Sequence, residues 1–213
     1  MALPANKLIT INDRGARAAT TFGSLSAGGA NMVFIKKLTA DGSGTTLSFV
    51  DGASDVVLDD TYKEYLFTFK DIHPQTDDVA FQFNLSVDTG SNYNVTKTTT
   101  VFRARHDEAD SQADLLYVTG DDLAQSTGVQ SILKGLGSDN DECGSGTLTL
   151  FNPSSTTFVK HFIASTPFSN KDPAARSLFT AGYGNTTSAV DAIQFSMSSG
   201  NIDAGDICLY GIL

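Results

Sequence analysis

The chain has 213 residues, of which 40% are hydrophobic and 18% charged, so it can bury a sizeable core as one all-β domain or one domain plus a short arm. Its net charge of −10 at pH 7 disfavours nucleic-acid binding, because a phosphate backbone would be repelled. No stretch approaches the roughly 18 apolar residues of a membrane helix, and the start of the chain lacks the apolar core of a signal peptide, so we expect neither membrane insertion nor secretion.

Residues 1–31 differ from the rest of the chain because they combine small residues and glycines with little periodicity. This composition predicts an extended arm that becomes ordered only against a partner. Within it, the segment KLITI at residues 7–11 can add as a strand to the sheet edge of a neighbour. The residues that we expect to make this attachment are Lys7, Leu8, Ile9, Ile11, Arg14, Arg17 and Phe22.

From residue 32 onward the sequence predicts about ten β-strands. The clearest is the segment 79–87, in which Val79, Phe81 and Phe83 begin an alternation with small or polar residues, as expected of a strand with one buried face. Residues 32–40 and 45–50 flank a glycine-containing loop and are predicted to form a hairpin. The other predicted strands are 63–72, 95–105, 115–120, 144–153, 156–166, 177–184, 189–198 and 206–213.

One segment, 122–137, predicts a short helix, which we place at residues 129–136. Gly135 and Gly137 are suitable helix stops. The apolar residues that would share one helical face are Leu123, Val129, Ile132, Leu133 and Leu136.

Turn residues recur every ~10–15 positions between these strands, which favours an antiparallel two-sheet sandwich of jelly-roll type at residues 32–213, with one short helix and the extended N-terminal arm at 1–31. The last two strands, 189–198 and 206–212, are predicted to form a closing hairpin that turns at Gly200 and Asn201. The residues that this hairpin would add to the core are Ile193, Phe195, Ile207 and Leu209.

Two acidic segments could be interpreted as functional sites. In RARHDEAD, His106 lies beside two arginines and three acidic residues, which could build a metal site or an acid–base pair, although a solvated loop is the interpretation we favour. Residues 139–150 resemble a calcium-binding loop, but Cys143 stands at the fifth position and Leu150 at the twelfth, where oxygen ligands are required. A disulfide between Cys143 and Cys208 is left open.

The chain contains none of the common catalytic or phosphate-binding motifs, such as GxSxG, HExxH, GxxxxGK[ST] or GxGxxG. We therefore expect a protein that is not an enzyme and that binds no cofactor or metal. A polar, glycine-rich sandwich with an attachment arm is more typical of an assembly component, which buries its faces or its arm against copies of itself.

Four segments of the chain carry a resemblance to a known family. FIKKLTADGSGTTLSFVDG, EYLFTFKDIHPQTDDVAFQFNLS, GTLTLFNPSSTTFVKHFIAS and AGYGNTTSAVDAIQFSMSSGNIDAGDICLYGI together resemble virion structural proteins of marine tailed bacteriophages, cyanophages among them. In these phages the module occurs as a small separate protein and as the end of longer fibre-like proteins. The resemblance covers about residues 34–212, and its most specific part is the closing motif SSGNIDAG…LYGI.

This resemblance implies a place in the virion, as a capsid decoration or as a tail, neck or fibre component, with no catalytic residues. The expected partners are copies of the chain itself, forming a homo-oligomer that would be a trimer in a fibre, and other virion proteins such as the major capsid, tail or neck proteins. The alternative is a carbohydrate-binding module for host adhesion, in which the loops 87–94 and 106–114 would contact cell-surface glycans.

Overall fold

Antiparallel strands make up all the regular secondary structure in residues 31–213, the part of the chain that the computed structural model describes. The all-β prediction is confirmed over these residues. They include no helix long and apolar enough to cross a membrane. The twelve strands are β1 (Met32–Thr39), β2 (Thr46–Val50), β3 (Glu64–Pro74), β4 (Val79–Ser86), β5 (Lys97–Asp107), β6 (Ala113–Tyr117), β7 (Gln130–Leu136), β8 (Gly144–Phe151), β9 (Lys160–Asn170), β10 (Ala174–Gly184), β11 (Ala192–Met197) and β12 (Ile202–Ile212).

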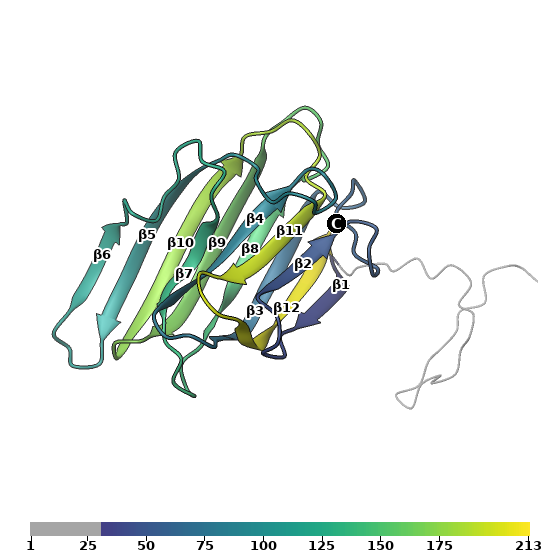
Figure 1. The fold of residues 1–213 in the computed structure, drawn as a ribbon. Helices are drawn as coiled ribbons and strands as arrows, with labels where there is room; N and C mark the ends of the chain where they lie inside the picture. Colours follow the sequence, from purple (N-terminus) through teal and green to yellow (C-terminus); the bar gives the residue numbers. More distant parts are fainter. Residues whose placement is uncertain (1–30) are drawn as a thin grey trace, which may run out of the picture. The chain divides into compact units, whose positions relative to one another are not determined.

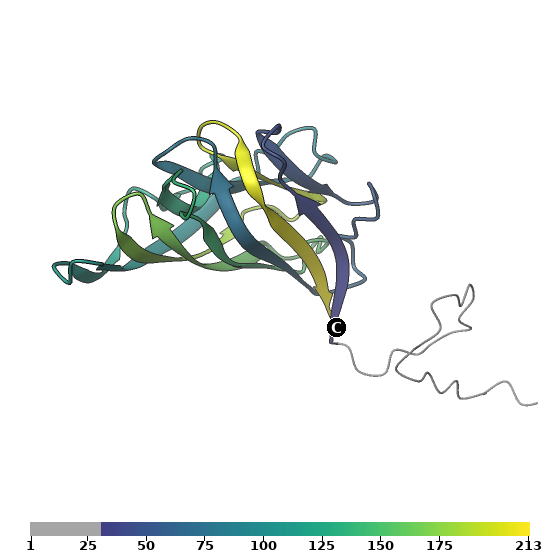
Figure 2. The same ribbon diagram turned by 90° about the horizontal axis from the view of Figure 1, so that it is seen from below.

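Nine of these strands follow one another in a sheet that curves into a nearly closed barrel (Figures 1 and 2). Their order is β1-β12-β3-β8-β9-β7-β4-β11-β2. The strands at the two ends of this path, β1 and β2, are consecutive in the chain and are joined only by the short loop 40–45. The two ends of the path are therefore held near each other, and the barrel encloses the core.

Three strands lie off this path, and we name β10, β5 and β6 together the wing. β10 pairs with β9 along its whole length, β5 pairs with β10, and β6 pairs with β5. Figure 1 shows the wing extending away from the barrel, with β6 farthest out. The inner face of the wing carries the buried side chains of Val101 and Leu178, and the outer face carries Phe102 and Phe179.

The core is dominated by phenylalanine side chains from opposite walls of the barrel, with Phe195 of β11 at the centre. Phe195 is fully buried, and its ring stacks on Phe81 with a centroid distance of 5.7 Å. Aromatic pairs of this kind contribute beyond the area they bury. The five phenylalanines whose ring centroids lie 5.3–6.4 Å from that of Phe195 are Phe49, Phe67, Phe69, Phe81 and Phe83.

The helix predicted at residues 129–136 is wrong, because this segment forms the strand β7. β7 pairs with β4, and the pairing skips Ile132 and Gly135, so each of these residues forms a bulge. Gly135 has a φ of +81°, a backbone conformation that glycine adopts readily. Since a bulge shifts the alternation by one residue, neighbouring side chains such as Ile132 and Leu133 are both buried. The resulting apolar spacing imitates that of a helix.

The predicted two-sheet jelly-roll sandwich is not confirmed, because the pairing of Leu136 in β7 with Asn170 in β9 joins all twelve strands into one sheet. The two predicted hairpins are wrong. β1 pairs with β12 whereas β2 pairs with β11, and β11 and β12 are likewise placed in different parts of the sheet. The core residues expected of β11 and β12, namely Ile193, Phe195, Ile207 and Leu209, are fully buried as predicted.

Candidate functional site

The outer face of the wing carries an exposed apolar surface that continues onto β9. Phe102 lies between Phe179 on one side and Tyr117 on the other in a cross-strand row, and the rings of Phe102 and Phe179 stack with centroids 4.8 Å apart. Contiguous apolar surface of this kind usually marks a site of association. The most exposed members are Leu115 (72% exposed), Ile163 (53%), Tyr117 (49%) and Phe102 (43%), and we name these residues with Phe179 the apolar face of the wing.

The strand β6 forms the outer edge of the wing and has few of the features that usually protect an edge strand. It pairs with β5 on one side only among the described strands. Its sequence, ADLLY, contains no lysine and no proline, and the β5–β6 pairing has no bulge. Its one charge, Asp114, points to the inner face, where it pairs with Arg103 and Arg105. An edge of this kind is open to pairing with another strand.

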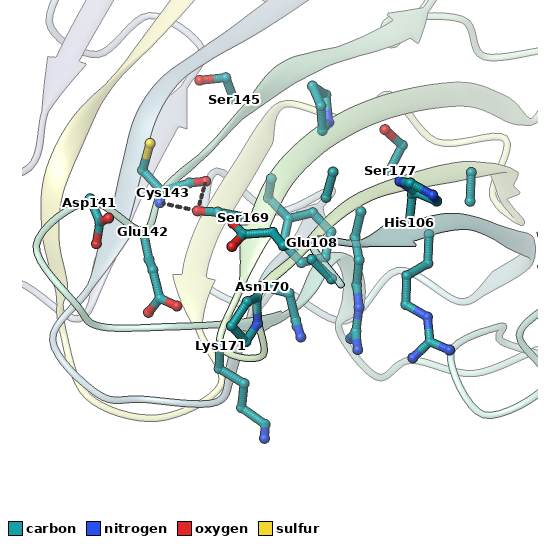
Figure 3. A pocket seen from close by; sticks show the side chains of 18 of the residues that line it. His106, Glu108, Asp141, Glu142, Cys143, Ser145, Ser169, Asn170, Lys171 and Ser177 are labelled. Carbon is teal, nitrogen blue, oxygen red and sulfur yellow. Dashed lines mark hydrogen bonds between the residues drawn. The ribbon is translucent and has the colours of Figure 1, made fainter. Parts of the chain in front are cut away.

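A pocket of about 900 Å³ with a mixed polar and apolar lining opens where β9, β10 and β5 meet the segment before β8 (Figure 3). His106 and Glu108 reach it from the end of β5, and Asp141 and Cys143 reach it from the segment before β8. The structure thus brings together two acidic segments that the sequence analysis treated separately. Their proximity follows from strand register, which neither segment reveals by itself.

Ser169 and Cys143, two side chains of this pocket, are not arranged as activated nucleophiles. Ser169 donates its hydroxyl proton to the carbonyl oxygen of Cys143 at 3.4 Å and accepts the Cys143 amide at 3.0 Å, so it is engaged with backbone rather than with a base. Burial, with the nearby Asp71 carboxylate, raises the pKa of the Cys143 thiol, which disfavours the thiolate. Within residues 31–213 no cluster of three or more His, Cys, Asp or Glu side chains could hold a metal ion.

Strand alternation divides the cluster around His106 that the sequence suggested. His106, near the end of β5, lies 3.1 Å from Asp110 in the exposed turn that follows the strand. Arg103 and Arg105 point to the opposite face, where both contact Asp114. The alternative grouping of arginines, histidine and carboxylates is therefore not assembled, and the favoured interpretation of a solvated loop agrees with the exposure of this turn.

The calcium-like segment also forms ordinary local structure. Asp139 accepts the backbone amide of Glu142 at its carbonyl oxygen, and its own amide donates to the Glu142 carboxylate at 3.0 Å, so these groups cap one turn before β8. Cys143 and Cys208 are both free thiols, which answers the question of their pairing.

Two buried lysines were missed by the sequence analysis. Lys97 at the start of β5 is fully buried, and its ammonium group donates to Asn84 Oδ1 and, at 2.8 Å, to the carbonyl oxygen of Val95. Lys160 at the start of β9 is equally buried and donates to two backbone carbonyls. Burial lowers the pKa of Lys97 to about 8 and also lowers that of Lys160. The sequence does indicate this burial, because Val95, Lys97 and Val101 are separated by even numbers of residues and therefore point to the same face of a strand.

The residues assigned to the attachment arm, namely Lys7, Leu8, Ile9, Ile11, Arg14, Arg17 and Phe22, lie outside the described residues, so their role stays a prediction. Of the two loops proposed for glycan contact, the loop 87–94 is ordered by Asp88, which accepts the amide of Asn92 at 2.8 Å, and by Asp191, which accepts the amide of Thr89.

Comparison of the chain with family models, with curated proteins and with solved structures finds no match.

Proposed function

We propose that the protein is a non-enzymatic structural component of a bacteriophage virion, as a capsid decoration or as a part of the tail, neck or fibre. The resemblance of residues 34–212 to phage virion proteins supports a location in the virion. The observation that carries the structural role is the apolar face of the wing beside the open edge of β6. A surface of this kind gains free energy when another protein covers it.

The occupant that we propose for this surface is a second copy of the chain. Two β6 strands related by a two-fold axis can pair antiparallel through their open edges, which joins the two wings into one continuous sheet. Leu115 and Tyr117 would then be cross-strand neighbours of the same residues of the second copy. The row of side chains that contains Phe102 and Phe179 would continue across the contact. Asp114 does not oppose this pairing, because it is already paired on the inner face.

Replacement of Leu115 by lysine tests this contact. We expect the wild-type chain to sediment as a dimer and Leu115→Lys to raise the dissociation constant at least about tenfold, equivalent to ~1.4 kcal/mol, because the two-fold axis would bring two like charges close together across the paired edges. The matched control is Leu213→Lys, since Leu213 is similarly exposed (74%) but lies at the end of the chain. Analytical ultracentrifugation over a concentration series gives both constants. A wild-type monomer or trimer at all concentrations, or equal effects of the two variants, would contradict the contact.

Attachment to the rest of the particle is the role that we propose for the N-terminal arm. Deletion of residues 1–30 is expected to leave a folded protein, because the described core is built from residues 49–209, and to abolish incorporation into particles. Circular dichroism of the truncated protein and immunoblots of purified virions measure the two outcomes. Incorporation of the truncated protein at the wild-type level would exclude the arm as the attachment segment.

A further inference from the structure

The inner face of the wing gathers all three arginines of residues 31–213. Arg103 and Arg105 lie two residues apart on β5 and so share a face, and Arg176 on β10 is directly opposite Arg105. Their placement is unexpected in a chain of net charge −10, because like charges directly opposite each other in a sheet repel. We name these three residues the arginine cluster.

The arginine cluster is largely removed from solvent. The side chains of Arg103, Arg105 and Arg176 are 21%, 22% and 14% exposed. The Nε atom of each is buried and has no hydrogen-bond partner in the structure. Burial, together with the charges of the other two arginines, lowers the pKa of Arg176. A buried donor without a partner is unfavourable, more so when it carries charge.

The carboxylates nearby do not balance this charge. Asp114 is shared, with one oxygen 3.3 Å from Arg103 Nη2 and the other 2.9 Å from Arg105 Nη2. Asp172 lies 3.7 Å from Arg176 Nη2, but it is 62% exposed and is also 3.2 Å from Lys171 Nζ. Among the described residues there are therefore two carboxylates within 4 Å of the three guanidinium groups, Asp114, which is shared by two arginines, and Asp172, which is exposed and also pairs with Lys171.

A pocket of about 210 Å³ lies against Arg103 and Arg176 of this cluster, between the wing and β7. Arg103, Arg176 and Lys134 contribute positive charges to its lining, and Asp121 contributes the one negative charge, which is paired with Lys134. Because a water molecule occupies about 30 Å³ in the liquid, the pocket has room for a group of the size of phosphate.

We propose that Arg103 and Arg176 of the arginine cluster bind an oxyanion, a carboxylate or a phosphate group, in the pocket between the wing and β7. Guanidinium groups present planar pairs of donors that match these anions, and charge-assisted bonds of this kind are stronger than neutral ones. The anion would supply acceptors for the guanidinium groups of Arg103 and Arg176 and would offset part of the unbalanced charge. It could come from a free ion or from an acidic segment of another protein chain. The site lies on the opposite face of the wing from the apolar face, so it does not depend on the proposed self-association.

Isothermal titration calorimetry of the full chain tests the site with two probes, inorganic phosphate and a hexaglutamate peptide. The control for each probe is a titration with sodium chloride at the same ionic strength. We expect saturable binding of at least one probe. Arg176→Met is expected to weaken it about tenfold or more, as for loss of a bond to a charged group. Lys37→Met removes one positive charge far from the pocket, on β1, and is expected to bind as the wild type does. Binding of phosphate alone identifies a free ion as the source, and binding of the peptide identifies a protein segment.

A second variant keeps the proposal testable if Arg176→Met fails to fold. Arg103→Lys retains the charge but loses the planar pair of donors, and it is expected to weaken binding with an unchanged circular dichroism spectrum. Failure of the wild-type chain to bind either probe, or equal affinities in the wild type and the folded arginine variants, would overturn the proposal.

Discussion

Phe195→Ala is expected to lower the free energy of unfolding by about 4 kcal/mol, the largest effect of any single substitution that we predict. Phe195 is fully buried and contacts aromatic rings from several strands of the barrel, so its removal leaves a cavity that rigid neighbours cannot fill. For a domain of this size the loss corresponds to a fall in Tm of roughly 10 °C. Urea denaturation followed by fluorescence or circular dichroism measures it.

The matched control is Phe158→Ala, because Phe158 is the same residue type but is 67% exposed. It is expected to change the free energy of unfolding by less than about 0.5 kcal/mol. Similar effects of the two substitutions would show that Phe195 is not at the centre of the core, and they would contradict the barrel arrangement itself.

We expect the free energy of unfolding to increase as the pH rises through the weakly alkaline range, because the buried Lys97 loses its charge there. Its pKa is about 8 in the folded protein, whereas an unfolded lysine has a pKa of about 10.4. Between these values the unfolded chain binds more protons than the folded one, so the free energy of unfolding increases with pH. The contribution of Lys97 opposes folding by about 3 kcal/mol at neutral pH, and about 2 kcal/mol of this is relieved by pH 9.5.

Lys97→Met isolates this contribution, because other groups also titrate in the same range. The difference in unfolding free energy between the wild type and Lys97→Met is expected to change by about 2 kcal/mol in favour of the wild type from pH 7 to pH 9.5. Lys63→Met, at an exposed lysine, serves as the control and is expected to follow the wild type. Parallel pH profiles for the wild type and Lys97→Met would mean that Lys97 is not buried in its charged form.

Most strands were predictable from the sequence, including β1, β3 and β12, whose pairings contain irregularities, whereas β7 was not. β4 was recognised because Val79, Phe81 and Phe83 keep a period of two, and all three are buried. β7 was mistaken for a helix because bulges at Ile132 and Gly135 change the phase of the alternation. A bulge depends on the partner strand, so one segment read alone cannot reveal it.

Strand pairing and the candidate sites escaped sequence analysis for a related reason. Consecutive strands such as β11 and β12 looked like a hairpin, yet each pairs with strands distant in the sequence. The arginine cluster forms only because β10 and β5 align Arg176 with Arg105. The apolar face of the wing likewise requires the register that places Phe102 beside Phe179. Local patterns define which side chains share a face of one strand, but register decides which faces meet.

The most direct test of the structural role is a cryo-electron microscopy reconstruction of intact phage particles that carry the protein. The account predicts repeated copies of the chain in the particle, with β6 paired to β6 of another copy and with Leu115 and Tyr117 beside the same residues of that copy. Particles that lack the chain, or copies in which the edge of β6 remains open to solvent, would contradict it.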